Sequence, residues 1–60
     1  MTGEDPLRVV VADDHPVVRA GLRAVVESQP DLRVVGEFDT AEALVGWVAG
    51  GGRADVVLLD

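Results

Sequence analysis

Three aspartates stand directly after short apolar runs, and they are the residues of this chain best suited to bind a cation. Asp13 and Asp14 follow Leu7 to Ala12, and Asp60 follows Val56 to Leu59. Carboxylate oxygens suit Mg²⁺, which commonly takes one or two carboxylates together with phosphate oxygens. A carboxylate can also act as a nucleophile and form an aspartyl phosphate. If the fold gathers these side chains, the pattern predicts an acidic magnesium pocket for phosphoryl chemistry.

The apolar pattern predicts the elements that would carry these aspartates. The valine-rich run from Leu7 to Ala12 predicts a first strand, which stops abruptly at Asp13. Apolar residues then recur at helical spacing from Pro16 to Ser28 and predict a helix. A proline suits the first turn of a helix, and either Asp14 or His15 can cap it.

The range 32–38 predicts a second strand that is more polar on one side. Strict alternation of side chains would place three of its residues on each face. A strand at the edge of a sheet tolerates such polar positions, whereas a strand covered on both faces is continuously apolar. The predicted faces are Leu32, Val34 and Phe38 on one side, and Arg33, Val35 and Glu37 on the other.

A second helix and a third strand are predicted to follow. Asp39, with Glu42 three residues later, has the form of a capping box, and the glycines at 50–52 end the helix. Trp47 flanks the apolar stripe of this helix and is expected to be a partly buried packing residue. The run Val56 to Leu59 is apolar on both faces and predicts an internal strand. The stripe of the helix comprises Ala41, Leu44, Val45 and Val48.

Strand, helix, strand, helix and strand with short connections predict an α/β fold with a parallel sheet. The second strand is the expected edge, so the predicted strand order is 2-1-3, and right-handed crossovers then send the two helices to opposite faces. In such sheets, binding sites form beyond the carboxyl ends of the strands where the winding reverses, here between the first and third strands. Because neighbouring strands lie about 4.8 Å apart, we expect Asp13, Asp14 and Asp60 to meet there.

Length and composition exclude several classes of protein. A chain of 60 residues forms one domain at most. Eleven acidic residues against five arginines give a net charge of -6, the wrong sign for neutralising nucleic-acid phosphates. The absence of cysteine excludes disulfides and thiolate metal sites. No apolar run approaches the roughly 20 residues of a membrane helix, and the acidic N-terminus does not resemble a signal peptide, so we expect a cytoplasmic protein without membrane contact.

Two stretches of the chain resemble the receiver domain of bacterial two-component response regulators. They are Arg8 to Arg23 (Arg-Val-Val-Val-Ala-Asp-Asp-His-Pro-Val-Val-Arg-Ala-Gly-Leu-Arg) and Ala54 to Asp60 (Ala-Asp-Val-Val-Leu-Leu-Asp). The Asp-Asp-His-Pro form followed by Val-Arg-Ala-Gly-Leu is most similar to the subgroup in which the receiver precedes a LuxR-type DNA-binding domain. The resemblance implies a flavodoxin-like fold, truncated after the third strand. Residues 1–6 would then be a lead, and 7–60 the N-terminal half of a receiver domain.

The resemblance also implies roles for the three aspartates. Asp14 would coordinate Mg²⁺ directly, Asp13 would assist directly or through water, and Asp60 would bind the metal and accept the phosphoryl group. The donor would be a sensor histidine kinase, and the protein would be a switch rather than an enzyme. DNA would be bound by a C-terminal domain outside this sequence and not by this segment, and the full-length protein could form a homodimer.

Simpler interpretations stand beside these. An Asp-Asp pair after a strand can serve only as a helix cap. His15 could be a metal ligand or a phosphohistidine, but beside Pro16 a surface or capping role is commoner, so it is not counted in the site. Gly50 to Gly52 could suggest a phosphate loop, but it precedes a strand and lacks the lysine and hydroxyl of a Walker loop.

Two other functions use similar residues. An aspartate-dependent phosphohydrolase also places aspartate after its first strand, but in the pattern Asp-x-Asp. A flavodoxin-like cobalamin-binding module carries Asp-x-His-x-x-Gly, which Asp13 and His15 match, but Val18 stands where glycine is required.

Overall fold

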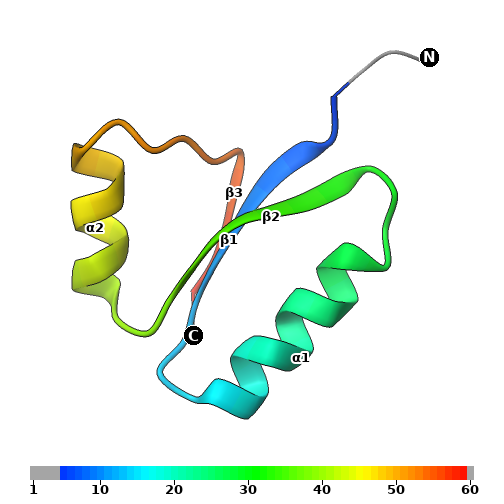
Figure 1. Cartoon of the computed structure of the whole chain (residues 1–60), viewed down its shortest axis with the longest axis horizontal. Helices are drawn as coiled ribbons and strands as arrows, with labels where there is room; N and C mark the ends of the chain where they lie inside the picture. Colours follow the sequence, from blue (N-terminus) through cyan, green and yellow to red (C-terminus); the bar gives the residue numbers. More distant parts are fainter. Residues whose placement is uncertain (1–4, 60) are drawn as a thin grey trace.

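The computed structural model describes residues 5–59 and contains the five predicted elements in the predicted order. They are β1 (Leu7–Ala12), α1 (Pro16–Glu27), β2 (Leu32–Phe38), α2 (Ala41–Ala49) and β3 (Val56–Leu59) (Figure 1). The first helix ends one residue before the predicted Ser28, which is its C-cap. None of the helices within residues 5–59 is long and apolar enough to cross a membrane.

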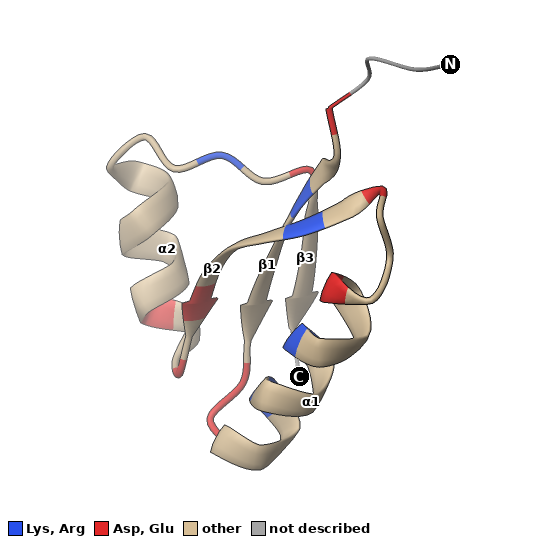
Figure 2. Cartoon of the chain, turned by 45° about the vertical axis from the view of Figure 1, so that its right-hand side comes forward, with Lys and Arg blue, Asp and Glu red and all other residues tan. Residues whose placement is uncertain are grey.

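The three strands form one parallel sheet in the order β2-β1-β3, which confirms the predicted topology. The central strand β1 contributes the most buried side chains, Val9, Val10 and Val11. It is covered because α1 and α2 lie on opposite sides of the sheet (Figures 1 and 2). A strand that is covered on both faces must be apolar at successive positions, which explains the valine run.

β2 contains a bulge that simple alternation does not predict. Val9 pairs with Val34, but Val10 pairs with Gly36, so Val35 is an extra residue in the strand. The bulge exchanges the faces of the residues that follow it, so the predicted faces of β2 are wrong for Glu37 and Phe38, whereas Val35 lies opposite Val34 as predicted. The observed faces are Leu32, Val34 and Glu37 towards α1, and Val35 and Phe38 towards α2.

Helix α1 begins at Pro16, as the sequence predicts, and ion pairs join it to β2. His15 occupies the N-cap position, but its side chain makes no capping hydrogen bond. Val26 is the buried residue of the helix. Arg23 donates to Glu37 at 2.6 Å, and the Nε of Arg19 lies 3.6 Å from the same carboxylate.

Helix α2 is capped by Thr40 and not by Asp39, so the predicted capping box is wrong by one residue. The Thr40 hydroxyl accepts a hydrogen bond from the Ala43 N–H at 3.0 Å. Leu44 is the buried residue of α2 and packs on β1. Trp47 is partly buried, as predicted, with its ring centroid 5.6 Å from that of Phe38.

The connection from α2 to β3 depends on glycine at two positions. Gly51 has a φ of 105°, a conformation that residues with a Cβ rarely adopt. A Cβ at Gly52 would overlap the ring of Trp47. The predicted helix stop at 50–52 is therefore confirmed, and Gly52 has a packing reason in addition.

The start of β3 is fixed to the start of β1 by a reciprocal pair of hydrogen bonds. The Arg8 N–H donates to the Asp55 carboxylate at 2.7 Å, and the Asp55 N–H donates to the Arg8 carbonyl at 2.8 Å. Within residues 5–59, β3 pairs with β1 alone. Val56 and Val57 stay partly exposed as a result.

Candidate functional site

A pocket of about 260 Å³ lies at the carboxyl ends of the strands, where the sequence predicts the site. All three strands contribute to its lining, either directly or through the loops that follow them. Figure 2 shows acidic residues in the loops after β1 and β2, at this end of the sheet. The lining residues are Ala12, Asp13, Asp14, Asp39, Thr40, Ala41 and Leu59.

Asp13 is the buried acidic residue of this site. It is only 2% exposed, and its backbone N–H continues the sheet by donating to the Phe38 carbonyl at 3.0 Å. Burial of a carboxylate is costly unless donors or cations surround it. The His15 backbone N–H supplies one such donor, at 2.7 Å from Asp13 Oδ1. Asp13 is thus held in one place by both its backbone and its side chain.

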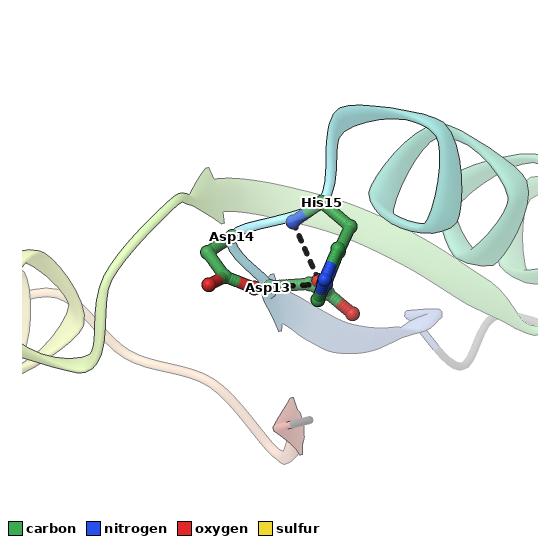
Figure 3. Close-up of side chains that lie close together, drawn as sticks. All are labelled: Asp13, Asp14 and His15. Carbon is green, nitrogen blue, oxygen red and sulfur yellow. Dashed lines mark hydrogen bonds and ion pairs between the residues drawn. The ribbon is translucent and has the colours of Figure 1, made fainter.

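The His15 ring lies against both aspartates. Its Nδ1 is 2.9 Å from Asp13 Oδ1 and 2.8 Å from Asp14 Oδ1 (Figure 3). One ligand atom from each of the three residues lies within 4.8 Å of the others. His15 is not among the site residues that the sequence predicts, although its position directly after the aspartate pair is a signal for it.

Asp14 differs from Asp13 in its exposure to solvent. The Asp14 side chain is 75% exposed and that of Asp13 is wholly buried. The pair therefore combines a fixed, buried carboxylate with a solvent-exposed one that a ligand arriving from solution can reach. Two hard oxygen donors of this kind fit Mg²⁺, which binds through few carboxylates and keeps several waters. The imidazole nitrogen is a poorer ligand for Mg²⁺, so His15 is better suited to orient the carboxylates than to bind the metal.

Asp39 and Thr40 also line the pocket and were not proposed as site residues from the sequence. They follow β2, which neighbours β1, and in a parallel sheet the loops after neighbouring strands lie at the same end. Their spacing in the sequence predicts only a helix cap. Thr40 does cap α2, and Asp39 adds a third acidic residue to the lining of the pocket.

Asp60, the predicted phosphoacceptor, lies outside the described residues. The residue before it, Leu59, lines the same pocket as Asp13 and Asp14. Leu59 also pairs with Ala12, the last residue of β1. The end of β3 is therefore beside the end of β1 as far as residue 59.

A larger hollow of about 530 Å³ lies at the opposite end of the sheet and has mixed charge. Asp5, Arg8, Arg33 and Asp55 are among its lining residues. The Arg8 backbone N–H, and then the Arg8 side chain, lower the pKa of Asp55 below its ordinary value of 3.8. This carboxylate fixes β3 and has no part in the acidic pocket.

Comparison with curated proteins identifies bacterial regulators as relatives. The chain is 41% identical over 54 residues to "Response regulator UvrY" of Escherichia coli O157:H7, and the matched region covers 90% of this chain and 24% of the relative. It is 33% identical over 60 residues to "Nitrate/nitrite response regulator protein NarL" of Escherichia coli K12, covering 100% and 27%. It is 39% identical over 57 residues to "Uncharacterized transcriptional regulatory protein YxjL" of Bacillus subtilis 168, covering 95% and 26%.

The chain spans about a quarter of the length of these relatives. No protein-family model and no solved structure matches it.

Proposed function

This chain is a homologue of the bacterial response regulators, and we propose that it is the part of a receiver domain that binds Mg²⁺ and accepts a phosphoryl group. Its parallel sheet has the 2-1-3 order expected of a flavodoxin-like receiver. The observation that carries the proposal is the pairing of a buried and an exposed aspartate at the end of β1, beside the end of β3.

Each aspartate has a separate task in this proposal. Asp14, which is exposed, binds the cation directly, and Asp13 supports it from a fixed position. Asp60, at the end of the run that forms β3, is the phosphoacceptor and the third metal ligand. Bound Mg²⁺ supplies positive charge that offsets the carboxylates and the incoming phosphoryl oxygens.

The transfer is a displacement at phosphorus. A carboxylate oxygen of Asp60 forms the new O–P bond, while the P–N bond to a histidine of a sensor kinase breaks and its electron pair returns to the imidazole. No net oxidation occurs. The protein mainly positions the groups and neutralises charge, which an acidic pocket at the end of a rigid sheet can do once a cation is bound.

The phosphorylated chain acts as a signalling switch for a DNA-binding domain elsewhere in the protein. Support comes from the relatives, one of which is described as a transcriptional regulatory protein. The net charge of -6 argues that this segment does not itself contact DNA. A sensor histidine kinase is the proposed phosphoryl donor, and a cytoplasmic location is the sequence-based expectation.

The test compares two aspartate substitutions in the full-length protein. Asp60→Asn should abolish the acid-stable, hydroxylamine-sensitive labelling obtained with radioactive acetyl phosphate and Mg²⁺. Asp31→Asn is the matched control, because Asp31 is exposed and the Leu7 N–H donates to its backbone carbonyl, which the substitution leaves in place. Undiminished labelling of Asp60→Asn would refute the assignment of the phosphoacceptor, and repeated turnover of a small phosphate ester would favour a phosphohydrolase instead.

A further inference from the structure

We propose that Arg19 is a positioning residue that holds the loop after β1 so that Asp13 and Asp14 present their carboxylates to a divalent cation. The inference rests on the proposed function. It starts from one contact: Arg19 Nη1 donates a hydrogen bond of 2.9 Å to the Asp13 backbone carbonyl. Arg19 is therefore the side chain of α1 that reaches back to the buried aspartate.

The backbone of Asp13 is held by hydrogen bonds to two different elements. Its N–H donates to the Phe38 carbonyl at the end of β2, at 3.0 Å, and its carbonyl accepts from Arg19 of α1. Asp14 and His15 follow without any further strand pairing. The Arg19 contact thus fixes the direction in which the chain leaves β1, and that direction determines where the Asp14 carboxylate lies.

Arg19 is itself held in place by Glu37. The Arg19 Nε lies 3.6 Å from Glu37 Oε1, and Arg23 Nη1 lies 2.6 Å from the other oxygen, Oε2. The Arg19 side chain is 23% exposed, whereas that of Arg23 is 52% exposed. A guanidinium can make both of the Arg19 contacts because its donors form a rigid fork.

The charge of Arg19 and its positioning role have opposite effects on cation affinity. A guanidinium near the site repels a cation, so removing its charge alone would tighten Mg²⁺ binding. Loss of the hydrogen bond to Asp13 would weaken binding, because groups that orient metal ligands typically contribute about 10- to 100-fold to affinity. Weaker Mg²⁺ binding by an Arg19 variant therefore indicates a positioning role, whereas tighter binding indicates that Arg19 only repels the cation.

The experiment measures Mg²⁺ affinity by calorimetric titration of the full-length protein and three variants. Arg19→Gln removes both contacts. Arg19→Lys keeps a positive charge opposite Glu37 but lacks the forked donors of the guanidinium. It provides the test if Arg19→Gln fails to fold. Arg23→Gln is the matched control, because it removes an α1-to-β2 ion pair with Glu37 without a contact to Asp13. Amide NMR shifts of Asp14, recorded without metal, give an independent readout of loop position.

We expect Arg19→Gln to bind Mg²⁺ about tenfold more weakly. Arg19→Lys should change in the same direction, and Arg23→Gln should stay within about twofold of the unsubstituted protein. The Asp14 amide should shift in the Arg19 variants and not in the control. Unchanged or tighter binding by Arg19→Gln, or an equal loss in Arg23→Gln, would overturn the proposal. Absence of Mg²⁺ binding by the unsubstituted protein would instead refute the proposed function, and this inference with it.

Discussion

Replacing glycine by alanine at three positions around the end of α2 should change stability with different signs. Gly46 lies inside the helix, and a Cβ there would meet nothing within 4 Å. Alanine is favoured over glycine in a helix interior by about 1 kcal/mol, so Gly46→Ala should stabilise the fold. A Cβ at Gly52 would overlap the Trp47 ring, and overpacking of this kind costs about 1–3 kcal/mol.

Gly51→Ala separates backbone strain from packing at the same turn. Nothing lies within 4 Å of its Cβ position, but its φ of 105° is unfavourable for alanine. Left-handed backbone costs a non-glycine residue about 1–2 kcal/mol, so this variant should also lose stability. Gly51→Asn is the matched comparison, since asparagine tolerates positive φ better than alanine does.

Urea unfolding of the full-length protein, followed by circular dichroism and by Trp47 fluorescence, measures these changes. With a urea m value of about 1–2 kcal/mol/M, a loss of 2 kcal/mol lowers the midpoint by about 1–2 M. The packing explanation predicts that Gly52→Ala costs much less in a Trp47→Leu background, which lacks the large ring; circular dichroism alone measures unfolding in that background. An unchanged or raised midpoint for Gly52→Ala would refute the close approach of Gly52 to Trp47.

Three further outcomes are expected. Both Asp13→Ala and Asp14→Ala should weaken Mg²⁺ binding measured by calorimetry, with Asp14→Ala the more damaging, and unchanged binding in both would refute the acidic pocket. The folded pKa of Asp55 is lowered, so its contribution to stability is present above the ordinary value of 3.8 and is lost as the pH falls through the lower, folded value. Asp55→Asn should therefore flatten the acid side of the curve of stability against pH. An NMR titration of Asp55 checks the direction of the pKa shift. The 60-residue chain expressed alone should show neither cooperative monomeric unfolding nor acetyl phosphate labelling, because most of β3, including Val57, stays exposed. A sharp monomeric transition by circular dichroism with normal labelling would contradict this.

The sequence by itself determined the elements, the strand order and the place of the acidic pair. These features follow from local patterns: the valine run of β1 can lie only in a covered strand, and Pro16 and the glycines after α2 mark helix ends. The parallel 2-1-3 arrangement then follows from general rules of chain connection, which also put Asp13 and Asp14 at the end of the sheet where sites form.

Only the tertiary structure decided the contacts between these elements. The bulge at Val35 depends on how β2 fits against β1 and α2 together, and it moves Glu37 to the side of the two arginines of α1. That exchange of faces lets Arg19 lie between Glu37 and the Asp13 carbonyl. Such contacts join residues from separate elements, so no periodicity in the chain reports them. They are set by the packing of whole elements, because a one-residue change of register moves every later side chain of a strand to the other face.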